Sequence, residues 1–555
     1  MLSQFVNRAQ AKAVNGQLDP SKIGVQIYEK QDQFGPGFPH SGKFALPFHI
    51  TNMCASDMGI ICGKPGDFQD WVASNSDDLQ NRFAWFRDPS AGADNSEDRC
   101  HHYPRAIMGE YLKTKFQEAV QSAKQAGLEV NLYPRSEVVD LKQNSGKIIL
   151  RIRDLRSNNN FSKEADRVLL ATGHWFEKND QDHYFSSPWP ADKLRRSIPR
   201  GAKVAVIGTS LSAIETLLTL TSPENFVRRP GGRLVYEAPK KTRTFYLYSR
   251  RGLLPKVRGK MGNYQNRFLT RENLDLLLSD NPGNLALDAI FELLDSELEA
   301  AYGQGIKWEE IVNPAGQPAD LLQGYLNDAV NGDGPHGEII WQTILYQSFD
   351  MVREIYLNLT LEDRKRFDKN YTSVFFTHAA TQPAVNAEKL LALMKAGIVE
   401  VFKLGNSYQL VQNEVNDYFE FIYRDTRGNL KRDTYRYVVD ARGQKKSLAT
   451  NPSLLVKNLL RRGTVLIKEF RSADHGLSAD RAPAGETYET GSIWIDPATQ
   501  RIMQMSPESI AARFSAIYAV GAMTRGQIID ASMARGIVQA TARIADDLVD
   551  YLIRT

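Results

Sequence analysis

One short segment carries the clearest chemistry in the sequence. Residues 204–207 (Val-Ala-Val-Ile) are apolar without alternation, which is typical of a strand covered on both faces. Residues 208–210 (Gly-Thr-Ser) form a turn, and leucine and isoleucine recur at helical spacing over residues 211–218. The first backbone N–H groups of such a helix are unpaired and lie at the positive end of its dipole. The segment therefore predicts a cradle for the pyrophosphate of a dinucleotide.

The residues of this turn have distinct predicted roles. Gly208 permits the turn, and Ala213 allows the helix to pack closely on the strand. Ser210 stands where the usual glycine-rich pattern has its second glycine, and its hydroxyl can donate a hydrogen bond. We expect cofactor contacts from Gly208, Thr209, Ser210, Ser212 and Ala213. The alternative is an ordinary buried turn between a strand and a helix.

The next predicted strand indicates which dinucleotide would bind. Residues 245–249 are mostly aromatic or apolar, and Arg250 and Arg251 follow them directly. An acidic residue at that strand end would bind the ribose hydroxyls of NAD, whereas an arginine pair suits the additional 2′-phosphate of NADP. The alternative is a solvated basic loop, since arginine is common on surfaces.

A second strand ending in an acid lies near the start of the chain. Residues 22–30 predict a strand that follows a helix over residues 3–15, and Glu29 is placed at its end to bind a ribose. A dinucleotide unit also needs a first strand and a glycine-rich turn before that helix, and there is no room for them before Ser3. Either the given start lies inside the true reading frame, or this nucleotide site has lost its phosphate cradle. Glu29 could also be an ordinary surface acid.

The end of the chain carries another strand, turn and helix. Residues 516–522 predict a buried strand that leads into a turn with Gly521, Thr524 and Gly526, followed by a long helix over residues 529–553. Backbone N–H groups at such a turn and helix start can face a cofactor. The alternative is a structural strand with a packing helix.

The composition bounds the class of protein. At 555 residues, 42% of them hydrophobic and 24% charged, the chain has room for two to four globular domains. A net charge of +4 with dispersed basic residues gives no indication of nucleic-acid binding. We see no signal peptide and no membrane-spanning run, so we expect no membrane partner and a cytoplasmic location. The three cysteines lack CxxC spacing, so we expect no disulfide framework, no thiol-redox pair and no metal site.

An internal repeat suggests how the chain is organised. Gly127 to Gly173 spans the same number of residues as Gly397 to Gly443, and each span runs from a helix cap through a predicted meander to a strand and a small-residue turn. Two matched meanders suit two nucleotide-binding units. We predict a first unit over residues 1–195, a second over 196–395 and a return to the first over 396–555. A helical insertion at about residues 265–370 would roof a cleft or form a peripheral bundle.

These motifs together resemble the bacterial flavoproteins with two dinucleotide-binding domains, and most closely a family of FAD/NAD(P)-binding proteins related to N-hydroxylating flavin monooxygenases. The resemblance spans almost the whole chain. It implies an α/β fold of two Rossmann-like domains, each a glutathione-reductase-like three-layer ββα arrangement. The segments that carry it are Glu29, residues 103–105 (Tyr-Pro-Arg), 109–112 (Gly-Glu-Tyr-Leu), 171–175 (Ala-Thr-Gly-His-Trp), 208–213, 249–255 and 518–526.

The resemblance implies FAD in the first unit and NADPH in the second. Glu29 would bind the adenosine ribose, Asn52 would lie near the flavin ring, and Gly521 with the start of the last helix would face the pyrophosphate or the ribityl chain. The remaining motif residues with a predicted cofactor contact are Arg105, Thr172, Gly173, Thr524 and Gly526.

Three functions remain open at this point. The first is an NADPH-dependent flavin monooxygenase acting on a small molecule, with an amine or amino-acid nitrogen as the family-based expectation. The second is an NAD(P)H-dependent flavin reductase or oxidase. The third is a non-catalytic nucleotide-binding protein. No catalytic side chain can be named, because no triad or carboxylate pair is discernible, and the oligomeric state stays open.

Overall fold

The structure is a computed structural model of the whole chain. It describes residues 1–87, 100–144, 146–176, 182–413, 415–443, 447–471, 486–505 and 512–555.

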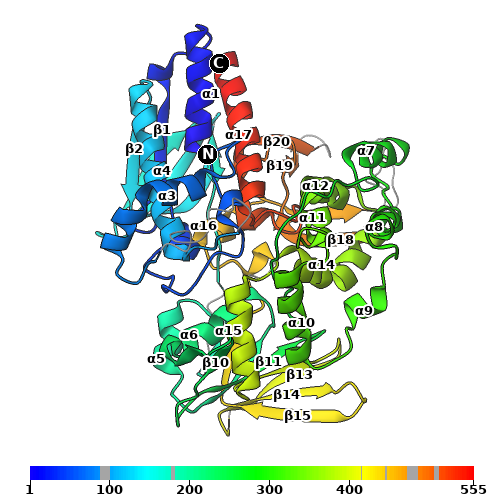
Figure 1. Cartoon of the computed structure of the whole chain (residues 1–555). Coiled ribbons are helices and arrows are strands. Elements are labelled where there is room, and N and C mark those ends of the chain that lie inside the picture. The colour runs from blue at the N-terminus through cyan, green and yellow to red at the C-terminus, as the bar shows by residue number, and fades with distance from the viewer. Residues whose placement is uncertain are drawn as a thin grey trace.

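The lower part of Figure 1 is built on one parallel sheet of five strands. Its central strand β8 is fully apolar after Lys203, and Val204, Ala205 and Val206 are completely buried, because both faces of the sheet are covered. In spatial order the strands are β12 (Val399–Lys403), β11 (Thr244–Ser249), β8 (Lys203–Ile207), β16 (Tyr437–Asp440) and β7 (Tyr184–Phe185).

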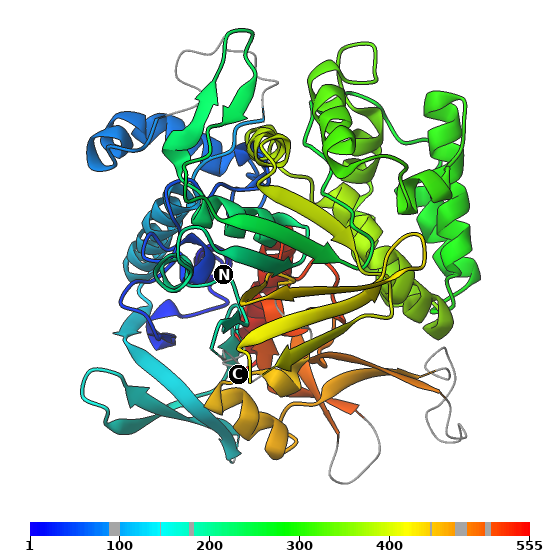
Figure 2. The same cartoon turned by 90° about the horizontal axis from the view of Figure 1, so that it is seen from below.

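Different layers cover the two faces of this sheet (Figure 2). Helices α6 (Leu211–Leu220) and α15 (Ala384–Lys395) share an apolar core with one face. An antiparallel meander covers the other face through aromatic rings, among them Phe421 stacked on Tyr248 with ring centroids 4.4 Å apart. The other elements of this unit are β13 (Gln409–Asn413), β14 (Tyr418–Arg424), β15 (Leu430–Tyr435), α5 (Ala191–Ser197), β9 (Phe226–Arg228) and β10 (Leu234–Tyr236).

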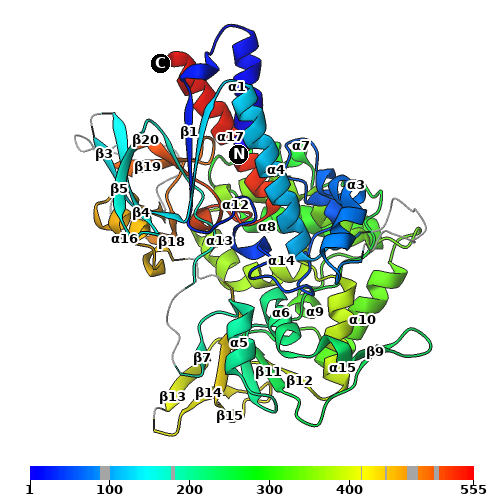
Figure 3. The same ribbon diagram turned by 90° about the vertical axis from the view of Figure 1, so that its left-hand side faces the viewer.

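The upper part of the molecule is the other α/β unit, the one predicted as the first (Figure 3). Helices α1, α4 and α17 pack together through apolar residues, so the two ends of the chain contribute to one core. The unit contains α1 (Leu2–Val14), β1 (Gly24–Glu29), α2 (Gly37–His40), α3 (Asp67–Arg82), α4 (Arg105–Gln125), β2 (Glu129–Pro134), β3 (Ser136–Asn144), β4 (Lys147–Asp154), β5 (Asn160–Ala165), β6 (Val168–Leu170), α16 (Leu454–Arg461), β17 (Ile467–Arg471), β18 (Thr487–Ile493), β19 (Arg501–Met505), β20 (Ala512–Ala519) and α17 (Ala534–Arg554).

The parallel strands of this upper unit form two separate pieces. β1 pairs with β2, while β6 pairs with β20, both in parallel register. Strands β3, β4 and β5 form an antiparallel meander, as β13 to β15 do in the lower unit. The predicted internal repeat of helix, meander and strand is confirmed, and so is the predicted fold class of two dinucleotide-binding units.

A set of helices between residues 271 and 379 stands beside the two units, coloured green in Figure 1. It matches the predicted helical insertion and extends a little beyond residue 370. Its helices are α7 (Arg271–Asp280), α8 (Leu287–Tyr302), α9 (Trp308–Val312), α10 (Pro318–Asn331), α11 (Ile340–Gln347), α12 (Phe349–Asn358), α13 (Leu361–Arg366) and α14 (Thr372–Ala379).

The strand pairing corrects one predicted boundary. We expected the chain to return to the first unit at residue 396, but β12 and β16 pair with β11 and β8 in the sheet of the second unit. The return therefore comes after Asp440. The reason is that the pairing of β12 and β16 depends on segments far away in the sequence, which local patterns cannot show. Within the described residues, no helix is long and apolar enough to cross a membrane.

A buried ion pair ties the helical insertion to the upper unit. Arg353 of α12 donates to both carboxylate oxygens of Asp530, at 2.9 and 2.8 Å, and both side chains are at most 9% exposed. Removal of one partner from such a pair leaves an uncompensated buried charge.

We predict that Arg353→Ala lowers the free energy of unfolding by about 3–5 kcal/mol, because Asp530 stays buried without its partner. Arg366→Ala is the matched control, since it breaks the exposed pair with Asp288 and should cost at most about 1 kcal/mol. Urea denaturation followed by circular dichroism measures both. Equal losses would show that the pair does not join the insertion to the upper unit.

Candidate functional site

One continuous cavity of about 3050 Å³ runs between the two units and the helical insertion. The upper unit contributes all of β1, the segment 164–176 and residues 532–535, and the lower unit contributes Leu211 and Ser212. The volume is about three times the upper end of ordinary small-ligand pockets, about 1,000 Å³. It has room for more than one ligand.

The helical insertion forms a wall of this cavity. Gln342, Leu345 and Tyr346 of α11 and Phe349 of α12 line it, together with residues 378–380 at the end of α14. The Tyr346 hydroxyl donates to Asp57 Oδ1 at 2.7 Å, so the insertion also hydrogen-bonds to the upper unit. Of the two predicted roles for the insertion, the roof over a cleft is the one the structure shows.

The predicted pyrophosphate cradle opens on the cavity at the start of α6. Leu211 and Ser212 are the first residues of the helix, they line the cavity, and no side chain caps this end. Ser210 is the N-cap residue, and its carbonyl accepts from the N–H groups of Ala213 and Ile214. Helix N–H groups before Ala213 are therefore the ones presented to a ligand.

Two other residues of the turn hold its shape. Gly208 has φ +123°, and a Cβ there would lie 3.0 Å from the Ala441 carbonyl oxygen, so the position needs glycine for its conformation and for close packing. Thr209 donates its hydroxyl to the Leu253 carbonyl at 2.6 Å, and its Oγ1 lies 3.1 Å from Ser249 Oγ. These contacts join the turn to the loop after β11.

That loop contains the predicted arginine pair. Arg250 is exposed, and Arg251 is partly buried and donates to the Asn370 carbonyl at 2.8 Å. Burial and the charge of Arg250 lower the pKa of Arg251. Neither arginine lines the cavity, and both belong to the loop whose Leu253 carbonyl accepts the Thr209 hydroxyl.

Glu29 lies at the end of β1 and lines the cavity, as predicted for a strand-end acid. Its carboxylate accepts the N–H of Gln31 at 2.8 Å, and burial raises the pKa of Glu29. Beside it, β1 pairs with β2 alone and β6 with β20 alone among the described strands. The other edges of β1 and β6 both border the cavity.

The remaining predicted cofactor contacts of the upper unit divide into two groups. Asn52, Thr172 and Gly173 line the cavity. Thr524 and Gly526 are buried away from it, and a Cβ on Gly526 would lie 2.7 Å from the Thr490 carbonyl oxygen. Gly521 also lies outside the lining.

The cavity instead meets the chain near the last helix at Val520 and at Ser532, Met533 and Ala534. Helix α17 begins at Ala534 with Met533 as its N-cap, not at the predicted residue 529, and no side chain caps it. The sequence pattern indicated the correct helix but placed its first turn too early, because the apolar residues Ile528 and Ile529 continue the helical pattern backwards.

Arg105 forms a contact between the two units. Its guanidinium lies 2.6 Å from the Glu215 carboxylate of α6, whose side chain is 8% exposed. Its backbone N–H donates to the His49 carbonyl. Burial raises the pKa of Glu215, while the charge of Arg105 lowers it. Glu215 was not predicted, because its position in an otherwise apolar helix gives no local sign of a partner on another unit.

Two histidines lie near this ion pair, and His49 is the buried one. His49 is fully buried, its Nδ1 accepts the Leu46 N–H, and its Nε2–H therefore donates to Thr219 Oγ1 at 2.9 Å. Burial and the charge of Arg105 lower the pKa of His49 to about 3, and burial first and then Arg105 lower the pKa of His40 to about 3. Both rings are neutral at pH 7, and His49 acts as a packed hydrogen-bonding group.

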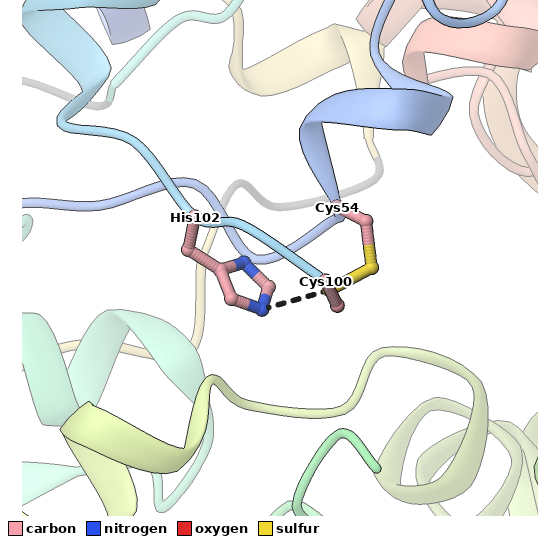
Figure 4. A group of neighbouring side chains, drawn as sticks. All are labelled: Cys54, Cys100 and His102. Carbon is pink, nitrogen blue, oxygen red and sulfur yellow. Dashed lines mark hydrogen bonds between the residues drawn. A yellow bond between two sulfur atoms is a disulfide. The ribbon is translucent and has the colours of Figure 1, made fainter. Parts of the chain in front are cut away.

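The structure overturns the expectation that the cysteines stay unpaired. Cys54 and Cys100 form a disulfide with their Cα atoms 4.9 Å apart, and the Nε2 of His102 lies 3.3 Å from Cys100 Sγ (Figure 4). Their donor atoms lie within 4.8 Å of one another. Because a disulfide offers no thiolate, this group is not a metal site in the form described. Cys62 is free and exposed.

Charged groups stand on the cavity wall close to this disulfide. Arg258 lines the cavity, and its Nε has no hydrogen-bond partner among the described residues. Burial lowers the pKa of Arg258, and the carboxylate of Asp57 raises it. Burial and the charge of Arg258 lower the pKa of His102 to about 4. A cation and an anion thus face the same part of the cavity.

The fold and this cavity define a protein with two dinucleotide-binding units that open on one shared site. Residues 5–175 match the model of a family described as FAD-NAD(P)-binding, which agrees with the resemblance stated from the sequence. YdhS of Escherichia coli (strain K12), described as an uncharacterized protein, is 25% identical to the chain over 450 residues, which are 76% of this chain and 79% of YdhS.

Several solved structures are similar over almost the whole chain. The reduced form of the ornithine hydroxylase PvdA from Pseudomonas aeruginosa has a TM-score of 0.47 and 12% identity, covering 99% of this chain and 96% of that one. The ornithine N-hydroxylase KtzI of Kutzneria sp. 744 has a TM-score of 0.45 and 13% identity, covering 98% and 96%.

We predict that the free energy of unfolding falls as the pH drops below about 6.5, the unfolded-state pKa of histidine. A pKa lowered in the folded state means that the unfolded chain binds more protons, so stability is full above pH 6.5 and is lost on the way down to about 3. His49→Gln should reduce this slope by about 1 kcal/mol per pH unit. Urea denaturation between about pH 6 and 4 measures it.

The matched control is His336→Gln, which replaces an exposed ring. This variant should show the same dependence of the free energy of unfolding on pH as the parent protein. If both variants keep that slope, His49 is not held neutral in the folded protein.

Proposed function

We propose that the protein is an FAD- and NADPH-dependent oxidoreductase of the monooxygenase type that acts on a small molecule. The observation that supports it most is the single cavity bordered by Glu29, by the start of α6 and by the helical insertion. Two dinucleotides on separate sheets can exchange a hydride only where their binding sites open on the same space. In such a site the bound cofactors supply the redox chemistry.

The residues present fit the nicotinamide dinucleotide. The uncapped start of α6 offers the N–H groups of Leu211 and Ser212 to a pyrophosphate, and Gly208 keeps the turn free of a side chain. Arg250 and Arg251 lie on the loop joined to that turn and are the proposed contacts to a 2′-phosphate. Ser212 and Thr209 are the polar side chains beside them.

The residues of the upper unit also fit FAD. Glu29 is the proposed partner of the adenosine ribose, and the uncapped start of α17 at Met533 and Ala534 is the proposed site of the pyrophosphate. Thr172, Gly173 and Asn52 line the path between these points and the lower unit. The proposed chain residues bind and orient the cofactor, and α11 and α12 of the insertion exclude water from it.

The charged groups under the insertion favour a substrate with both an amine and a carboxylate. Arg258 offers a guanidinium with an unpartnered Nε among the described residues, and Asp57 offers a carboxylate held by Tyr346. A planar guanidinium binds a carboxylate in bidentate fashion. An amino acid or amine is therefore the substrate class that we propose, with oxidation at its nitrogen.

We expect the purified protein, supplied with FAD, to be yellow and to lose its visible flavin absorbance on anaerobic addition of NADPH. Colour should return in air, and turnover of a substrate amine should lower the amount of hydrogen peroxide released per NADPH. A protein that bleaches but releases peroxide stoichiometrically with every amine and amino acid tried is a reductase or oxidase. A protein that binds NADPH without bleaching is not an oxidoreductase.

A charge test addresses the choice of NADPH over NADH. Arg250→Ala with Arg251→Ala should raise the KM for NADPH about tenfold or more and leave that for NADH unchanged, because each lost charge-assisted hydrogen bond is worth about 1.5–3 kcal/mol. Initial rates of flavin reduction measure both constants. Arg195→Ala with Arg196→Ala, on helix α5, is the control pair. Equal losses for the two nucleotides would contradict the 2′-phosphate role.

A further inference from the structure

The Cys54–Cys100 disulfide lies at the wall of the shared cavity. Cys54 precedes the short helix Ala55–Asp57 and lines the cavity, while Cys100 lies in the segment before α4. The two cysteines are 46 residues apart in sequence, so the fold and not a local motif brings them together. A disulfide in this place can be reached by any small molecule that enters the cavity.

The neighbouring imidazole is arranged for the reduced form of the pair. The Nδ1 of His102 lies 3.0 Å from the Thr51 carbonyl oxygen, which can only accept, so Nδ1 carries the proton. The Nε2 atom then presents a lone pair to Cys100 Sγ at 3.3 Å. A disulfide sulfur has no proton to donate to it, whereas a Cys100 thiol has one.

The charge around the pair also favours the reduced form. Arg258 is close enough to His102 for its charge to lower the pKa of that ring, and its Nε has no partner among the described residues. The nearby Asp57 is turned toward the Tyr346 hydroxyl. A thiolate next to a cation is stabilised, and a pair whose reduced form is stabilised is more easily reduced than a structural disulfide.

We propose that Cys54–Cys100 is a redox-active disulfide that exchanges with small thiols entering the cavity. An incoming thiol gives its proton to His102 Nε2 as its thiolate attacks Cys54 Sγ; the S–S bond breaks, a mixed disulfide forms on Cys54, and Cys100 leaves as a thiolate that takes that proton back from His102 Nε2. A second thiol molecule then resolves the mixed disulfide. In sum two thiols are oxidised to one disulfide, and the protein gains two electrons and two protons as two thiols. This step does not need the proposed flavin chemistry.

The roles of the two sulfurs follow from their surroundings. The sulfur that leaves is the one that can be reprotonated directly, and Cys100 Sγ lies 3.3 Å from His102 Nε2. The sulfur that is attacked must face the cavity, and Cys54 does. His102 is a positioning residue here, because it acts through Cys100.

The test is an equilibrium titration of the full-length protein with glutathione and glutathione disulfide at pH 7. It uses a Cys62→Ser background, because Cys62 is the only other cysteine in the sequence. Acid quenching, maleimide labelling and intact-mass measurement give the fraction with two free thiols at each ratio. The same titration is run on His102→Asn, whose amide can keep the hydrogen bond to Thr51 but has no atom at the Nε2 position.

We expect the parent to be isolated as the disulfide and to become reduced within the accessible range of glutathione ratios. His102→Asn should lower the equilibrium constant for reduction about two- to tenfold, the worth of one hydrogen bond between neutral groups. His101→Asn, the neighbouring control, should match the parent, and all three oxidised proteins should melt at similar temperatures. A pair that glutathione cannot reduce, a protein isolated with both thiols free, or an equal constant in His102→Asn and the parent would each overturn the proposal.

Discussion

Two parallel sheets can bring their ligands together only if the carboxyl ends of their strands open on the same space. In this protein β1 and β6 of the upper unit and the start of α6, which follows β8 of the lower unit, all reach one cavity. The connections between the units and the helical insertion support that arrangement. The chain crosses between the units twice, and the helical insertion covers the space that results.

Buried charges hold the arrangement in place. The Arg105–Glu215 pair joins the start of α4 to α6, and the Arg353–Asp530 pair joins the insertion to the segment before α17. Each pair links elements from different parts of the fold, and each would leave an uncompensated charge if the parts separated. The neutral, doubly hydrogen-bonded His49 packs at the first of these contacts. The relative position of the two cradles is thus set by specific electrostatic contacts as well as by apolar packing.

The sequence predicted the parts whose signal is local. The strand, turn and helix around Gly208, the strand ending in Glu29 and the repeated meander all depend on residues that are neighbours in the chain. It could not predict which sheet β12 and β16 join, because strand pairing is non-local. The sequence analysis missed the Cys54–Cys100 disulfide for the same reason, since a spacing rule considers only cysteines that are close in sequence. The buried Glu215 became a candidate only when the fold placed it, and so did Arg258, whose Nε has no hydrogen-bond partner among the described residues.

The most direct test of the central claim is a crystal structure of the protein with FAD and NADP⁺ bound together. We predict that the pyrophosphate of NADP⁺ lies at the N–H groups of Leu211 and Ser212, that the adenosine ribose of FAD lies at Glu29, and that the two reactive rings meet inside the shared cavity. Either nucleotide bound outside this cavity, or rings that point away from each other, would contradict the account.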